Sequence, residues 1–208
     1  AVNDVVRSLT LDPPRSVLVT GEHGVGKTAL VQGVAKELGE RGWLVFQASG
    51  SDLIAGQSYI GQFEERARKL VAQIGGGRKV LWYIPDFQSL AWIGKSSNTH
   101  SSALDIIYPH LESGNIIVVG EMTTSAHQQL AQDKPRLGTV CETCRIDPLD
   151  EKETLDLAAA WAKAIQPDET TPLLPGDILE EAWLLARQYM RDREPPGCLL
   201  EFLNLTRK

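Results

Sequence analysis

Apolar and polar positions follow two different periods along the chain, and the changes of period predict its elements. Short apolar runs predict buried strands at residues 16–20, 43–46, 80–84, 116–119 and 143–146. Between them, apolar residues recur at helical spacing and predict helices at 27–38, 61–74 and 101–111. Because strands and helices alternate, we expect a parallel sheet sandwiched by helices, an α/β fold.

The pattern changes near Pro148, where we place a domain boundary. Beyond it only helices are predicted, and prolines separate them. They cover residues 152–164, 177–190 and 198–206. We therefore expect an α/β core at residues 1–148 and a small all-helical domain at residues 149–208.

Composition and charge narrow the classes of function. The chain has 208 residues, of which 42% are hydrophobic, and this is enough for a packed core. No apolar run approaches the roughly 18–20 residues of a membrane-spanning helix. A formal charge of −6 argues against nucleic acid as the main partner. Three cysteines and no signal-peptide pattern favour a cytoplasmic protein.

The strongest motif lies between the first predicted strand and the first predicted helix. It fits G-x-x-x-x-G-K-[ST] and consists of Gly21, Glu22, His23, Gly24, Val25, Gly26, Lys27 and Thr28, followed by Ala29. A glycine loop that leads into a helix directs backbone N–H groups at a phosphate chain, whereas a plain glycine turn would bind nothing. We expect Lys27 beside the β and γ phosphates and the Thr28 hydroxyl on Mg²⁺. The predicted cofactors are ATP or ADP, with Mg²⁺.

Four stretches together resemble the first ATPase module of the Clp-type unfoldases and disaggregases, within the AAA+ superfamily. They are residues 21–35, 53–66 (LIAGQSYIGQFEER), 120–124 (GEMTT) and 186–193 (ARQYMRDR). The resemblance implies a P-loop α/β domain with a helical lid, in hexameric rings that pull polypeptide through a pore. It also implies an adenine-contacting segment before residue 1 and a lid longer than this one. We therefore expect a module cut from a longer chain.

The resemblance assigns roles to two further residues. Tyr59 would project into the pore and grip the substrate polypeptide, although a loop aromatic can also serve as a half-buried anchor. Thr124 would sense the γ-phosphate and position water, although a threonine at a strand end can also cap a helix or a turn.

Three departures from the family concern hydrolysis. Where the family has paired acidic residues, this chain has Pro85-Asp86, so only Asp86 can orient water, and it is a methylene shorter than Glu. The family's intersubunit arginine pair falls at Thr139-Val140, and Arg136 is the nearest substitute. The lid's Pro-Asp-Lys segment reads Pro196-Gly197-Cys198 and has lost its cation.

Three hypotheses about function remain. The first is an ATP-binding module with impaired hydrolysis that shapes a ring. The second is a non-catalytic scaffold or adaptor, and the third is a competent ATPase that uses Asp86. Whether the chain is an enzyme therefore stays open.

A second motif is the segment Cys141-Glu142-Thr143-Cys144. It could hold zinc or act in redox chemistry, but a strand is the simpler interpretation.

Overall fold

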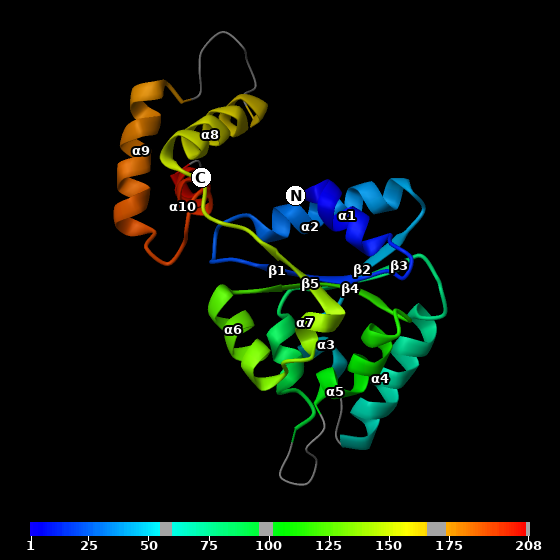
Figure 1. Cartoon of the computed structure of the whole chain (residues 1–208). Helices are drawn as coiled ribbons and strands as arrows, with labels where there is room; N and C mark the ends of the chain where they lie inside the picture. The colour runs from blue at the N-terminus through cyan, green and yellow to red at the C-terminus, as the bar shows by residue number, and fades with distance from the viewer. Residues whose placement is uncertain (55–59, 96–101, 166–173, 207–208) are drawn as a thin grey trace. The chain divides into compact units, whose positions relative to one another are not determined.

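The computed structural model describes residues 1–54, 60–95, 102–165 and 174–206, so Tyr59 lies outside the described residues (Figure 1). The strands are β1 (Ser16–Thr20), β2 (Leu44–Gln47), β3 (Val80–Ile84), β4 (Ile117–Met122) and β5 (Cys141–Arg145). The helices are α1 (Val2–Leu9), α2 (Lys27–Glu40), α3 (Gly50–Ile54), α4 (Ile60–Ile74), the 3₁₀ helix η1 (Phe87–Ala91), α5 (Ala103–Glu112), α6 (Thr124–Asp133), α7 (Leu137–Val140), α8 (Glu151–Ile165), α9 (Gly176–Tyr189) and α10 (Gly197–Thr206).

The strands form one parallel sheet in the order β2-β3-β4-β1-β5, so the predicted parallel sheet is confirmed. Each βαβ crossover requires a helix on one face of the sheet, which explains the alternation of periods in the sequence. The strands β1 and β4 lie at the centre and are buried along their whole length.

Helices cover both faces of this sheet. α1 and α2 lie on one face, and α4, α5 and α6 lie on the other (Figure 1). Trp82 and Val118 pack into the core that includes Ile107 of α5. Since successive strand side chains point to opposite faces, Tyr83 and Val119 point toward the face of α2.

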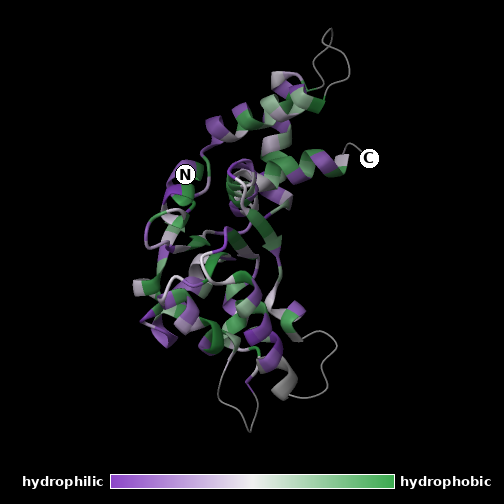
Figure 2. Cartoon of the chain, turned by 90° about the vertical axis from the view of Figure 1, so that its right-hand side faces the viewer, coloured by the Kyte–Doolittle hydropathy of each residue, from purple (hydrophilic) through white to green (hydrophobic). Residues whose placement is uncertain are grey.

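The chain divides into two compact units. The first contains residues 1–20 and 27–145, and the second contains residues 21–26 and 146–208. The second unit has a core of its own, built from α8, α9 and α10 around Ala158, Trp183 and Leu199. In Figure 2 the helices of each unit carry hydrophilic and hydrophobic residues side by side, as amphipathic helices do.

The structure adds elements to the expected pattern, among them α1, α3, η1, α6 and α7. The first strand is preceded by helix α1, whose Val5, Val6 and Leu9 are buried. The strand expected to end at Val119 continues as β4 to Met122, because β1 pairs with it as far as that residue. This extension places Glu121 inside a buried strand. Among the described residues, no helix is long and apolar enough to cross a bilayer.

Candidate nucleotide-binding site

The carboxyl ends of three neighbouring strands carry the predicted chemistry. β1, β3 and β4 lie side by side, and in open α/β sheets ligands bind beyond the carboxyl ends of the strands. The phosphate motif follows β1, Pro85-Asp86 follows β3, and Glu121 lies one residue before the end of β4.

The glycine-rich half of the motif lies in the second unit. Gly24 and Gly26 have φ values of +94° and +100°, in the left-handed region that side chains rarely adopt. The carbonyl oxygen of His23 accepts a hydrogen bond from the backbone N–H of Glu194 at 2.6 Å, and that of Gly24 accepts one from Gly197 at 3.0 Å. A Cβ atom at Gly24 would lie 2.4 Å from the Glu194 carbonyl oxygen. Glycine at position 24 is therefore required for both conformation and close packing.

The other predicted loop residues differ in exposure. Glu22 and His23 are exposed, whereas Val25 is buried. Lys27, Thr28 and Ala29 belong to the first turn of α2, in the first unit. The predicted strand, loop and helix are therefore all observed in the expected order.

Glu121 is a buried carboxylate that accepts two side-chain hydrogen bonds. Only 4% of the residue is exposed. The Tyr83 hydroxyl donates to Oε1 at 2.6 Å, and the Thr28 hydroxyl donates to Oε2 at 3.1 Å. A buried carboxylate requires such partners, because an isolated one would lose its hydration without compensation. Glu121 thereby links β3, β4 and the first turn of α2.

The Tyr83 phenol stays protonated in this arrangement. Burial raises its pKa, and the hydrogen bond to Glu121 together with the negative charge of that residue raises it further, while a hydrogen bond with Thr28 works in the other direction. A phenol that keeps its proton is a permanent donor to the carboxylate. Tyr83 therefore fixes the orientation of Glu121.

Asp86 lies after β3 and directly before η1. Its Oδ1 atom is buried and has no hydrogen-bond partner among the residues that the structure describes. Next to it, Phe87 is fully buried and packs against Gly120 so closely that a Cβ atom there would lie 2.7 Å from the ring. The ring of Phe87 therefore fixes the backbone beside Asp86. The Oδ1 atom of Asp86 can accept a hydrogen bond from a ligand or water.

Thr124 is the first residue of α6, and its neighbour Thr123 is the N-cap residue. The Thr123 hydroxyl accepts a hydrogen bond from the backbone N–H of Ala126 at 3.2 Å. Capping is thus carried out by Thr123, and the sensing role predicted for Thr124 remains a prediction.

The C-x-x-C segment forms the strand β5, as the simpler interpretation predicted. Cys141 and Cys144 are three positions apart, so their side chains point to opposite faces of the sheet. Burial raises the pKa of the Cys141 thiol to about 12 and also raises that of Cys144. This geometry suits neither a disulfide between the two nor a shared metal ion.

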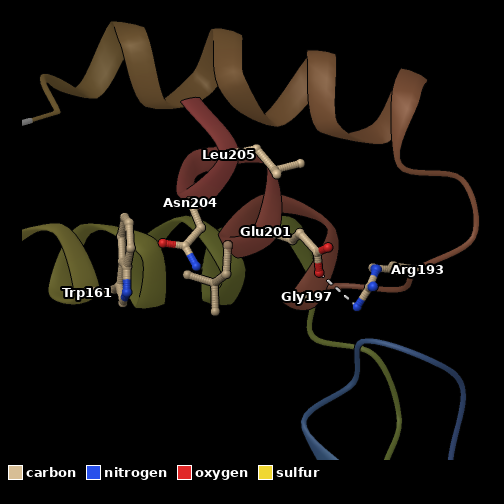
Figure 3. A pocket seen from close by; sticks show the side chains of 7 residues that line it. Trp161, Arg193, Gly197, Glu201, Asn204 and Leu205 are labelled. Carbon is tan, nitrogen blue, oxygen red and sulfur yellow. Dashed lines mark ion pairs between the residues drawn. The ribbon is translucent and has the colours of Figure 1, made fainter. Parts of the chain in front are cut away.

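A hollow in the second unit is lined by Trp161 of α8, by Arg193 and by residues of α10 (Figure 3). Arg193 Nη1 lies 2.8 Å from Glu201 Oε2, so the guanidinium on its rim is already paired. Its described lining includes none of the predicted site residues. Gly197, which lines the hollow, also donates its backbone N–H to the Gly24 carbonyl oxygen of the phosphate motif, at 3.0 Å.

With this geometry in place, the comparison with known families is decisive. Residues 1–177 match the family described as the AAA ATPase domain. The chain belongs to the AAA ATPase domain family.

Relatives place this AAA ATPase domain near the Clp proteins. The chain is 24% identical to the chaperone protein ClpB of Aquifex aeolicus over 98% of its own length and 21% of that protein. It is 25% identical to the ATP-dependent Clp protease ATP-binding subunit ClpE of Streptococcus pneumoniae over 96% of its length and 27% of that protein. The chain thus spans between about a fifth and just over a quarter of these two relatives.

Solved structures show the same fold. The Saccharomyces cerevisiae Hsp104–casein complex matches with a TM-score of 0.79 and 22% identity, over 98% of this chain and 36% of that one. The Hsp104–ADP complex matches with a TM-score of 0.76 and 21% identity, over 96% of this chain and 35% of that one. The predicted α/β P-loop fold and the resemblance to Clp-type modules are confirmed.

Membership of the AAA ATPase family implies nucleotide binding, typically with Mg²⁺, and the donor set suits that ion. The Thr28 hydroxyl and the Glu121 carboxylate are oxygen donors in mutual contact, and Mg²⁺ prefers oxygen ligands. The residues present therefore fit the group that the family implies.

Sequence reasoning had assigned no role to Glu121. Its signal is visible in the sequence, since one acidic residue stands in the otherwise apolar run from Ile116 to Met122. A carboxylate within a buried strand is rare unless it is paired or functional. What the sequence could not show is that Thr28 and Tyr83 surround it.

Proposed function

We propose that this chain is the ATP-binding module of a larger Clp-like protein-remodelling ATPase, in which it hydrolyses ATP slowly and acts in ring assembly or regulation. The observation that carries the proposal is the complete phosphate motif from Gly21 to Thr28 between β1 and α2. A scaffold without a nucleotide would have no use for Lys27 and Thr28 in this register.

We assign a task at the nucleotide to each of four residues. Lys27 places its charge beside the β and γ phosphates, and Thr28 offers a hydroxyl to the metal ion. Mg²⁺, when bound, would neutralise charge on the phosphates. Asp86 is the acid available after β3 to orient water, and Thr124 follows β4 as the proposed γ-phosphate sensor.

The residues at the positions that the family uses for hydrolysis explain why turnover would be slow. Pro85 has no side chain that can hold a metal-bound water, and Asp86 is shorter than the glutamate of the family. A misplacement of water by about 1 Å can cost about 100-fold in rate. Thr139-Val140 replaces the intersubunit arginines, and an arginine finger contributes about 10³–10⁵ in rate.

Partners follow from the relatives named above. ClpB is a chaperone, ClpE is the ATP-binding subunit of a protease, and Hsp104 is seen in a complex with casein. By analogy, this module would assemble with other AAA ATPase modules, as a hexameric ring, and act on polypeptide in the cytoplasm. Neither nucleic acid nor a membrane is part of the proposal.

One observation favours a second candidate function, a competent ATPase that drives unfolding through Tyr59. The buried Oδ1 atom of Asp86 has no partner among the described residues, as expected of a carboxylate kept free for water. Asp86 would then act as the base on its own.

Calorimetric titration of ATP in the presence of Mg²⁺ tests the binding proposal. Lys27→Ala should weaken binding by more than about 10-fold, because backbone N–H groups cannot replace a cation beside the phosphates. Lys36→Ala, which changes an exposed lysine of the same helix, is the control and should bind as the wild type does. Equal affinity in Lys27→Ala and wild type would refute nucleotide binding by this motif.

Steady phosphate release separates slow from competent hydrolysis. The wild type should turn over well below the range of about 1–100 s⁻¹ found for kinases, and Asp86→Asn should reduce release little or not at all. Replacement of Pro85-Asp86 by Asp-Glu should raise release where a neighbouring subunit supplies an arginine. Fast release that Asp86→Asn abolishes would establish the second candidate instead.

A further inference from the structure

The register of the sheet places Glu121 beside Pro85. On β3 and β4, Tyr83 pairs with Val119 and Ile84 pairs with Gly120. One step further, the same register brings Glu121 next to Pro85, and neighbouring strands lie about 4.8 Å apart. By the family resemblance, Pro85 stands where the first residue of the acidic pair is expected.

The two positions also share a face. Side chains two positions apart on a strand point the same way, so position 85 follows Tyr83 and position 121 follows Val119. The hydrogen bond from the Tyr83 hydroxyl to Glu121 Oε1, at 2.6 Å, shows that the two strands direct these side chains to the same side. The carboxylate of Glu121 therefore lies in the region that a side chain at position 85 would reach.

The hydroxyl predicted to hold Mg²⁺ lies against this carboxylate. Thr28 Oγ1 is 3.1 Å from Glu121 Oε2, and both belong to the first unit of the chain. A hydroxyl and a carboxylate form the kind of all-oxygen donor set that Mg²⁺ prefers. Asp86 belongs to the next segment, before η1, and its buried Oδ1 has no hydrogen-bond partner in the described structure.

We infer that Glu121 is the carboxylate that holds the Mg²⁺ ion of a bound nucleotide together with Thr28, in place of the side chain that Pro85 cannot supply. The inference rests on the proposed function, since it requires that the module binds a nucleotide. Tyr83 is a positioning residue, which acts through Glu121. The metal half of the site is thus present on a different strand, and slow turnover arises from Asp86 and the missing arginine.

Binding of Mn²⁺, which replaces Mg²⁺ and is detected by electron paramagnetic resonance, tests this directly. The probe is Mn²⁺ titrated into the purified protein with saturating ADP. Glu121→Gln keeps the size of the side chain and should weaken Mn²⁺ binding by about 10-fold or more. ADP affinity measured in EDTA should stay at the wild-type value, because that binding does not use the metal.

The matched control is Glu142→Gln on β5. This glutamate accepts a hydrogen bond from Ser8 and pairs with Arg15 at 3.4 Å. The Glu142→Gln variant should bind Mn²⁺ with the affinity of the wild type. Equal Mn²⁺ affinity in Glu121→Gln and wild type would overturn the inference, whereas a wild type that does not bind ADP at all would refute the proposed function.

A rescue experiment tests the equivalence of the two positions. Pro85→Asp in the Glu121→Gln background should restore most of the lost Mn²⁺ affinity, because the register of β3 and β4, continued one residue past the Ile84–Gly120 pair, brings the two positions side by side. A folded double variant without recovery would show that position 85 does not reach the metal. If Glu121→Gln does not fold, Glu121→Asp, which keeps the charge, takes its place. Glu121→Asp should also bind Mn²⁺ more weakly than the wild type, and it should bind ADP normally in EDTA.

Discussion

At the scale of single residues, the contact between Tyr83 and Glu121 joins two strands through their side chains. The phenol lies in a buried strand and donates at 2.6 Å to a carboxylate that is itself almost fully buried. Hydrogen bonds to charged groups contribute more than neutral ones, and a buried carboxylate that loses a donor is left partly unsatisfied. The pair is therefore important for stability as well as for the site.

Tyr83→Phe removes the hydroxyl and keeps the ring. We expect a loss of about 1–3 kcal/mol in the free energy of unfolding, measured by urea denaturation. Tyr108→Phe is the control, because its hydroxyl donates to the carbonyl of Arg136 at 3.2 Å in an exposed place, and it should cost less. Equal losses in both variants would contradict a special role for the Tyr83 hydroxyl.

Gly120 shows how one missing side chain shapes the site. A Cβ atom at this position would lie 2.7–2.8 Å from three atoms of Phe87, the residue that follows Asp86. Gly120→Ala should therefore cost about 1–3 kcal/mol, because overpacking displaces the ring. Thermal and urea unfolding should detect the change.

Gly39→Ala is the matched control for Gly120→Ala. A Cβ atom at Gly39 would have nothing within 4 Å, and alanine is a better helix former than glycine. This variant of α2 should be as stable as the wild type or more stable by up to about 1 kcal/mol. If Gly120→Ala were equally well tolerated, Phe87 could not be fixed by contact with β4.

At the scale of elements, α5 is fixed at its start by a capping box. The Ser102 side chain accepts from the backbone N–H of Asp105, and Asp105 accepts from the Ser102 N–H. Lys134, which follows α6, pairs with the same carboxylate. Although burial works in the opposite direction, Lys134 and Ser102 together lower the pKa of Asp105 to about 2.

This shift predicts how stability depends on pH. In the unfolded chain Asp105 takes up a proton near pH 3.8, whereas in the folded chain it does so near pH 2. The stabilisation is therefore complete above about pH 4 and is lost as the pH falls from about 4 to about 2. Asp105→Asn should flatten the pH dependence in this window, measured by urea unfolding, and Asp133→Asn, an exposed carboxyl of α6, serves as control. Parallel curves for wild type and Asp105→Asn would contradict the assignment.

At the scale of the whole molecule, the proposal separates binding of the nucleotide from its hydrolysis. In this proposal the phosphate motif, Thr28 and Glu121 would supply binding, and Asp86, which follows β3, would orient water. The chain spans only about a fifth to three tenths of its relatives. Arg136, exposed and directly before α7, is the nearest arginine in the sequence to Thr139-Val140, where the resemblance implies an arginine pair.

Arg136→Ala tests whether this residue replaces the family's intersubunit arginine. Because Arg136 precedes the aligned position by three residues, we expect phosphate release in the assembled protein to change by less than about 10-fold. A true arginine finger would cost about 10³–10⁵. Lys27→Ala, measured in parallel, should abolish release if the module hydrolyses ATP at all. A loss of the larger size in Arg136→Ala would show that the ring has a working finger.

The sequence by itself determined the alternation of strand and helix, the parallel sheet and the phosphate motif. These depend on local periodicity and on the backbone needs of a glycine loop, which neighbouring residues express along the chain. The helices α1, α3, η1, α6 and α7 were not predicted, and neither was the extension of β4 to Met122. Pairing with β1 decides that extension, and local propensity does not.

Only the tertiary structure decided where the carboxylates lie. Asp86 could be read from its place after an apolar run, but the role of Glu121 depends on the register between β3 and β4 and on the fold that brings Thr28 to it. Residues far apart in the chain become neighbours through strand pairing, and a single sequence does not specify that register. For this reason the resemblance could point to Pro85, where the family has an acid, but only the pairing of β3 with β4, continued one residue past Ile84 and Gly120, points to Glu121 as its neighbour.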